Sequence, residues 1–280
     1  MTMYEFRNKY RDIFGKLGLL DFLRKLHDFR YPFRHLKCLN DSRKRRNGRT
    51  DKKFLPLKEF KNIHENERCF IICTGPSLTL DDVNKLKNEY TFSMNSIIKL
   101  FDQTDWRPTY YVIEDPRACF KLNDELKKWN LNKMFTADFT AGESCMEPDL
   151  TDKFIQYPLD LLNHYYPGII KKPNVYLFSD DPYAIVYDGT SVTYSAMQIA
   201  AYMGFREIYL LGCDCDYSGG KQHFMDYGLK TETANDPESK AIAAYTTAKK
   251  YADEHGIKIY NATRGGKLEV FDRVDLDSLF

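Results

Sequence analysis

The chain has 280 residues and a mass of 32.9 kDa, which suffices for one large α/β domain with an appendage. It holds no run of about 18 apolar residues, and charged residues interrupt its first positions, so the sequence predicts neither a membrane span nor a signal peptide. Seven cysteines, several inside apolar runs, favour reduced thiols and a cytoplasmic protein.

The net charge of +1 conceals an uneven distribution. Residues 1–60 carry 17 Lys and Arg against 7 Asp and Glu, whereas residues 61–280 carry 24 against 33. This split predicts a basic arm over residues 1–60 and a mildly acidic body over residues 61–280.

The arm contains apolar residues every three to four positions from Tyr10 to Phe29, which predicts an amphipathic helix. Pro32 is expected to end or bend it, and residues 41–53 are expected to be an exposed linker. The arm could dock on the anionic inner face of a membrane, or pack on the body or on a second copy of the chain. Nucleic acid is not an expected partner, because the basic run has no interleaved aromatic residues.

The body alternates short apolar runs with helical segments, which predicts an α/β, Rossmann-like, mostly parallel sheet with helices on both faces. In such sheets ligands bind at the carboxyl ends of the strands. The expected strands are 69–73, 90–94, 109–113, 133–136, 154–157, 175–178, 207–211 and 258–260. The expected helices are 80–87, 116–129, 191–203 and 237–255.

The first expected strand runs directly into Thr74, Gly75, Pro76 and Ser77. Gly75 permits close backbone approach, Pro76 stiffens the exit, and Ser77 offers a helix cap and a hydroxyl. Free N–H groups at the start of a helix attract anions. Taken alone, Gly75, Pro76 and Ser77 are better explained as an ordinary turn.

Polar residues follow other strands and precede one helix. The amide of Asn95 could contact a nucleotide or cap a helix, and Asp115 could bind a ligand or act only as a cap. Gly189, Thr190 and Ser191 come immediately before an apolar helix, where amides and hydroxyls would suit a phosphate or a carboxylate.

Three further residues are candidates for catalysis. Asp214 and Asp216 follow the expected strand 207–211, and two acids spaced in this way on an extended chain point in the same direction. The pattern is also common by chance, and we expect no metal site there. His223 lies in the next loop and is the only histidine near the expected strand ends, so it suits proton transfer.

Taken together, residues 72–78, Asn95 and residues 190–214 resemble the bacterial sialyltransferases of lipooligosaccharide synthesis. They equally resemble the broader family of 6-hydroxymethylpterin pyrophosphokinase-like proteins, as do residues 104–110 and 261–266. The resemblance covers about residues 66–270 and implies a Rossmann-like, GT-A-variant-like fold.

The resemblance also implies roles for the residues after the first two strands. Thr74, Gly75, Pro76 and Ser77 would hold the phosphate and ribose of a nucleotide donor, and Asn95 would contact the nucleotide.

Further positions match the sialyltransferases in part. Thr190 and Ser191 fall where these enzymes place a turn for the sugar carboxylate and phosphate. Asp115 stands in place of an asparagine that contacts the donor, and residues 231–239 lack the histidine that acts as base. Proton transfer would therefore pass to His223 or to an aspartate.

The sequence thus predicts a glycosyltransferase that moves a sugar from a nucleotide-sugar donor, with a CMP-sugar favoured, to a cell-surface glycan or lipid-linked acceptor. The nucleotide-sugar is a substrate, and no cofactor is expected. One alternative is a pyrophosphokinase that transfers diphosphate from ATP to a pterin alcohol, with Mg²⁺ held by Asp115, Asp214 and Asp216. Another is a non-catalytic nucleotide-binding scaffold for polysaccharide assembly.

Overall fold

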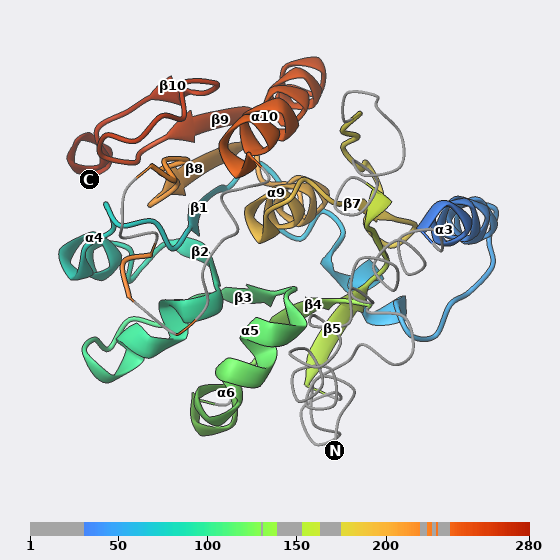
Figure 1. The fold of residues 1–280 in the computed structure, drawn as a ribbon, viewed down its shortest axis with the longest axis horizontal. Coiled ribbons are helices and arrows are strands. Elements are labelled where there is room, and N and C mark those ends of the chain that lie inside the picture. Colours follow the sequence, from blue (N-terminus) through green and yellow to red (C-terminus); the bar gives the residue numbers. More distant parts are fainter. Residues whose placement is uncertain are drawn as a thin grey trace, which may run out of the picture.

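The computed structural model describes residues 31–129, 131–138, 153–162, 175–218, 223–225, 228 and 236–280 (Figure 1). Within these residues, eight parallel strands form one sheet in the order β10-β9-β8-β1-β2-β3-β4-β5, and β6 pairs with β7 separately. Helices pack on both faces of the large sheet, as Figure 1 shows. The predicted α/β, Rossmann-like fold is therefore confirmed.

The strands of the large sheet are β1 Arg68–Ile72, β2 Tyr90–Met94, β3 Tyr110–Ile113, β4 Met134–Ala137, β5 Phe154–Tyr157, β8 Glu207–Leu211, β9 Lys258–Asn261 and β10 Asp272–Arg273. The small sheet consists of β6 Leu159–Asp160 and β7 Val186–Tyr187. The helices are α3 Tyr31–Arg46, α4 Leu80–Lys85, α5 Pro116–Lys121, α6 Asn123–Trp129, α9 Val192–Tyr202 and α10 Pro237–Glu254, with 3₁₀ helices η1 Leu55–Phe60, η2 Asn95–Asp102 and η5 Leu276–Leu279.

Side chains of each strand alternate between two apolar layers, as the pleat of a strand requires. On β1, Ile71 packs in the layer with α9 and α10, whereas Phe70 and Ile72 pack in the layer with α4, η2, α5 and α6. Both layers are fully buried, which explains why the strands read as continuous apolar runs in the sequence.

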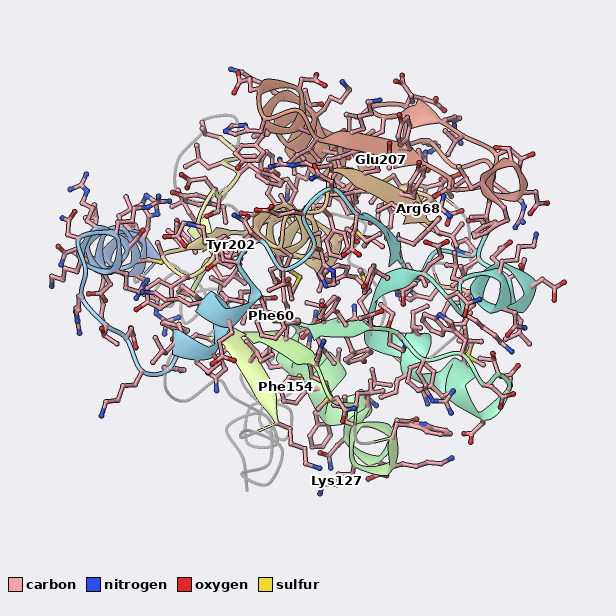
Figure 2. All side chains as sticks on the ribbon, turned by 180° about the vertical axis from the view of Figure 1, so that it is seen from behind. Phe60, Arg68, Lys127, Phe154, Tyr202 and Glu207 are labelled. Atoms are coloured by element: carbon pink, nitrogen blue, oxygen red, sulfur yellow. The ribbon has the colours of Figure 1, made fainter. Side chains whose placement is uncertain are left out.

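The strand order reverses direction between β1 and β8. From β1 the chain passes through α4 on one face to β2, and from β8 it passes through α10 on the opposite face to β9. Arg68 and Glu207 are the first residues of β1 and β8, and they lie opposite each other in the register of these two parallel strands. Figure 2 labels both in a view from behind. The carboxyl ends of β1 and β8 therefore form a topological switch point, the usual ligand site of such sheets.

The predicted strand over residues 175–178 is wrong, because this segment has no regular structure. Its backbone is instead bonded by side chains of α9: the Tyr194 hydroxyl donates to the Leu177 carbonyl at 3.0 Å, and the Ser179 amide donates to Gln198 Oε1 at 3.0 Å. Phe178 stacks on Tyr251 of α10. Residues 175–178 and their neighbour Ser179 thus pack on α9 and α10 and do not form a strand of the sheet.

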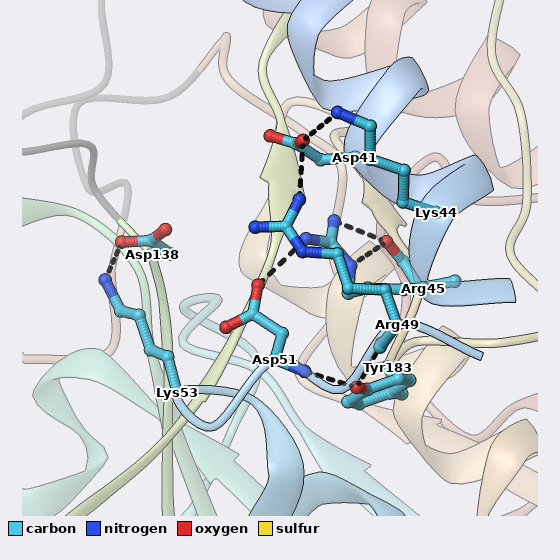
Figure 3. Close-up of polar contacts among 9 residues, drawn as sticks. Asp41, Lys44, Arg45, Arg49, Asp51, Lys53, Asp138 and Tyr183 are labelled. Atoms are coloured by element: carbon cyan, nitrogen blue, oxygen red, sulfur yellow. Dashed lines mark hydrogen bonds and ion pairs between the residues drawn. The ribbon is translucent and has the colours of Figure 1, made fainter. Parts of the chain in front are cut away.

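The predicted exposed linker is also wrong in part, because residues 41–46 belong to α3. Arg45 is buried and donates two hydrogen bonds to the Ala184 carbonyl, from Nε at 3.0 Å and from Nη2 at 2.7 Å. Figure 3 shows the surrounding contacts, including the ion pair of Arg45 with Asp51 and the Asp51 amide bonded to Tyr183. One arginine of this charged run is therefore buried and has a structural role. The predicted helix over residues 10–29 lies outside the described residues.

Six cysteines fall within the described residues, and all six are free thiols: Cys38, Cys69, Cys73, Cys119, Cys213 and Cys215. Within the same part of the chain, none of the helices has the length and apolarity needed to cross a bilayer.

The contact between His35 of α3 and Asp160 of β6 predicts a pH-dependent part of the stability. Nδ1 of His35 lies 2.7 Å from a carboxylate oxygen of Asp160, and this hydrogen bond raises the pKa of His35 above 6.5 despite the opposing effect of burial. The stabilisation is therefore complete below about pH 6.5 and is lost as the pH rises through the folded-state pKa.

We expect H35Q to lower the free energy of unfolding by about 1 kcal/mol at pH 6 and by less at pH 8, measured by urea denaturation. D160N, which removes only the charge of the partner, should abolish the same pH dependence. A difference between wild type and H35Q that stays constant from pH 6 to pH 8 would contradict this account.

Candidate active site

The loops that follow β1 and β8 are joined at the switch point. The Gly75 amide donates to the Gly212 carbonyl at 2.8 Å, and the Ser77 hydroxyl donates to Asp214 Oδ2 at 2.9 Å. Burial raises the pKa of Asp214, while the hydrogen bonds from Ser77 oppose this shift. A carboxylate is thus fixed beside the first turn after β1.

Glycine is required on two sides of Asp214. A Cβ atom at Gly75 would lie 1.8 Å from Asp214 Oδ2 and 2.5 Å from the Gly212 carbonyl oxygen. A Cβ atom at Gly266 would lie 2.5 Å from the Asp214 carbonyl oxygen, which accepts a hydrogen bond from the Lys267 amide at 2.7 Å. The position of Asp214 therefore depends on backbone approaches that only glycine allows.

His223 also lies beside the loop that follows β1. Its Nδ1 is 3.1 Å from the Thr74 hydroxyl, and the Phe224 amide donates to the Thr74 carbonyl at 2.9 Å. The structure thus brings together predicted site residues from the loops after β1 and β8, namely Thr74, Gly75, Pro76, Ser77, Asp214 and His223.

Asp216 does not join this group. Cys215 has a left-handed backbone with φ of 49°, so Asp214 and Asp216 do not point in the same direction as an extended chain would require. Asp216 instead accepts hydrogen bonds from Ser218 and pairs with Lys267 at 3.1 Å, and these contacts lower its pKa to about 2. The prediction of a shared direction is wrong for this reason.

Asp115 acts as a helix cap, which is one of the two roles that the sequence analysis left open. It caps α5 by accepting from the Arg117 amide at 2.8 Å, and it forms an ion pair with the Arg117 side chain at 2.9 Å. In the part of the chain that the structure describes, no three His, Cys, Asp or Glu side chains gather as a metal site.

The start of α9 lies over the ends of β1 and β2. The Thr193 hydroxyl is 3.3 Å from Cys73 Sγ and donates to Met94 Sδ at 3.4 Å. Ser191 caps the helix by accepting from the Thr193 amide at 3.3 Å. The positive end of the α9 dipole therefore lies at the same sheet edge as the loop after β1.

Gly189 and Thr190 shape the entry into α9. A Cβ atom at Gly189 would lie 2.3 Å from the Tyr194 ring, so glycine is needed there for packing. Thr190 has a left-handed backbone with φ of 65°, and its amide donates to Asp188 Oδ1 at 2.8 Å.

Asn95 follows β2 at this edge in a left-handed conformation with φ of 47°. Its carbonyl accepts a hydrogen bond from the Tyr111 hydroxyl at 2.6 Å. Its side-chain Oδ1 is buried and has no hydrogen-bond partner within the described residues. Because an unpaired buried acceptor is costly, this oxygen is suited to accept a hydrogen bond from a ligand.

Glu114 is a further candidate at this edge, to which the sequence alone assigned no catalytic role. It follows β3 and accepts a hydrogen bond from the Tyr157 hydroxyl at 2.7 Å. Burial raises the pKa of Glu114 to about 7, against the effect of the hydrogen bond from Tyr157, and the charge of Asp188 adds to the rise. The strand alternation offered a signal, because residues 110, 112 and 114 all face the layer that contains α9.

The model of the family described as 6-hydroxymethylpterin diphosphokinase MptE-like matches residues 46–220. The Maf glycosyltransferase of Magnetospirillum magneticum AMB-1 has a similar structure, with a TM-score of 0.48 and 16% identity over 81% of this chain and 38% of that one. The chain therefore spans well under half of the length of that protein.

A second similar structure is the sialyltransferase CstII from Campylobacter jejuni, with a TM-score of 0.41 and 15% identity over 74% of this chain and 86% of that one. The sequence has no significant match among curated proteins.

The contact between Gly75 and Asp214 predicts a non-additive pair of substitutions. G75A should lower the free energy of unfolding by about 1–3 kcal/mol, because its Cβ overlaps the Asp214 carboxylate and the Gly212 carbonyl. D214A should cost less in the G75A background than in wild type, because the alanine removes one of the two overlaps. Urea denaturation of the four proteins measures this coupling, and strict additivity would contradict the close approach.

Proposed function

The chain belongs to the 6-hydroxymethylpterin diphosphokinase MptE-like family, and we propose that it is a glycosyltransferase. It would move a sugar from a nucleotide-sugar donor to a hydroxyl group of a glycan or lipid-linked acceptor. The observation that carries the proposal is the convergence of the β1 loop, the β8 loop and the start of α9 at the topological switch point.

The donor phosphate would bind between the turn after β1 and the start of α9. The amides and hydroxyls near Ser77 and Ser191, together with the α9 dipole, favour a negative charge there. The buried oxygen of Asn95 would accept a hydrogen bond from the ribose or the base. We favour a CMP-sugar, because the motifs around residues 72–78 and 190–214 resemble those of sialyltransferases.

The leaving phosphate gains negative charge as the bond to the sugar breaks, so donors aimed at it would accelerate transfer. His223 is held beside Thr74 and therefore beside this phosphate, where an imidazolium would stabilise the leaving group. The Ser77 hydroxyl donates its one proton to Asp214 in this structure, so it would turn from that carboxylate to donate to the phosphate. Asp216 is engaged by Lys267 and has no direct part in this proposal.

One observation favours a second candidate, namely the family's own description as a pterin diphosphokinase. That reaction would move diphosphate from ATP to the hydroxyl of a pterin alcohol, with Mg²⁺ to neutralise the phosphates. It shares with the first candidate a nucleotide donor and a hydroxyl acceptor, so the donor preference separates the two.

We expect CMP or a CMP-sugar to raise the melting temperature of the protein in a thermal-shift panel that also contains UDP, GDP and ATP with 6-hydroxymethylpterin. At a concentration near 100 times Kd the stabilisation should be about 2.7 kcal/mol, or roughly 5–10 °C for a chain of this size. The response should persist in EDTA, because amides and hydroxyls would hold the phosphate.

Two variants localise the response. S77A should reduce the shift, since it removes a hydroxyl of the proposed phosphate site, whereas E207Q at the opposite end of β8 should keep it. A response confined to ATP with the pterin and Mg²⁺ would replace the first candidate with the second. A nucleotide response without any turnover of donor would point to the non-catalytic scaffold.

A further inference from the structure

Glu114 lies at the same sheet edge as the proposed phosphate site but at a distance from it. It follows β3, and β3 is two strands away from β1 in the sheet. Because neighbouring strands are about 4.8 Å apart, the ends of β1 and β3 are separated by roughly 10 Å. The acceptor oxygen would approach the reacting sugar carbon at about 3 Å from the side opposite the phosphate, so the Glu114 side chain has to span only the remainder of this separation.

The start of α9 connects the two places. Thr193 contacts Cys73, next to Thr74, and Ser195 lies one half-turn further along the helix beside Glu114. Glu114 extends from the same face of β3 as Val112, which packs in the α9 layer. The proposed phosphate site and Glu114 are therefore both bordered by the first turns of one helix.

The surroundings of Glu114 combine hydrogen-bond donors with acids. From β5, the Tyr157 hydroxyl donates to its carboxylate at 2.7 Å, and Ser195 of α9 lies close to it. The charges of Asp188, which precedes α9, and of Asp115, in its own loop, act on it as well. Among the described residues with the largest effects on this carboxyl group, none is a cation, and Glu114 remains partly accessible to solvent.

We propose that Glu114 is the general base of the transfer and removes the proton of the acceptor hydroxyl. This inference rests on the proposed glycosyltransferase function. The acceptor O–H bond breaks, its proton passes to the Glu114 carboxylate, and the oxygen forms the new bond to the sugar carbon. The bond from that carbon to the donor phosphate breaks, and its electron pair leaves with the nucleotide.

A base is most useful when its pKa lies near the working pH, since it is then both ionised and able to accept a proton. The pKa of Glu114, raised to about 7 mainly by burial, meets this condition. Glu114 is the active base when ionised, so kcat/KM should rise with pH through about 7.

Tyr157 is a positioning residue in this account, because its hydroxyl stabilises the ionised carboxylate. Y157F removes that hydrogen bond, so the pKa of Glu114 should rise and the acid limb of the pH profile should move to higher pH. A merely structural role for Tyr157 would lower activity without moving the limb.

The test uses the full chain and release of CMP from CMP-N-acetylneuraminic acid, with water as surrogate acceptor, or from whichever nucleotide-sugar gives the largest melting shift. E114Q should lower kcat by at least about 100-fold and keep the melting response to the donor. The matched controls are E207Q and Y209F. Tyr209 donates a hydrogen bond to Glu207 at 3.0 Å, as Tyr157 does to Glu114, but Glu207 lies at the amino end of β8, away from the proposed site. Both controls should retain wild-type turnover and an unmoved acid limb.

The outcomes separate the inference from the proposed function. A wild-type protein that neither binds nor turns over any nucleotide-sugar overturns the proposed function. Wild-type turnover that E114Q preserves within about threefold overturns the role of Glu114 alone. If E114Q fails to fold, the pKa of Glu114 is measured by carbon-13 titration of the glutamate side chains in wild type and in Y157F. A carboxyl group that titrates near pH 7, with a higher pKa in Y157F, supports the role as base. A Glu114 carboxyl group that titrates near pH 4.5 overturns it.

Discussion

The pairing of β1 with β8 continues beyond the last residues of both strands, and the site depends on this continuation. The Cys73 amide donates to the Leu211 carbonyl and the Gly75 amide to the Gly212 carbonyl, each at 2.8 Å. Such close contact leaves no room for a side chain at position 75. It also places Asp214 against Ser77, at the point where the chain leaves the sheet towards opposite faces. This backbone contact thus fixes the position of the proposed phosphate site.

The polar groups of the carboxyl edge divide into two sets along the sheet. Around β1 and β8 lie hydroxyls, the start of α9 and an imidazole, which suit a phosphate that departs. Around β3 and β5 lies Glu114 with Tyr157, in surroundings that keep its pKa near neutrality and suit a hydroxyl that loses its proton. The first turns of α9 border both sets, so a displacement of this helix would disturb donor and acceptor sides together.

The sequence alone predicted most strands and the turn at residues 74–77, because buried parallel strands are continuous apolar runs that end in small residues. It could not predict that residues 175–178 cover α9 without joining the sheet, since their bonding partners lie on a helix. Nor could it foresee the left-handed backbone of Cys215, which separates Asp216 from Asp214. Glu114 was given no catalytic role because its raised pKa comes from burial under residues distant in the chain.

The central claim is that the edge at β1 and β8 holds the donor phosphate, and a crystal structure with the preferred nucleotide bound tests it most directly. The account predicts a phosphate oxygen within hydrogen-bond distance of the Ser77 hydroxyl and of an amide at the start of α9. A nucleotide bound elsewhere would contradict it, for instance in the cavity of about 380 Å³ lined by Arg107, Trp129 and Lys133 before β3 and β4.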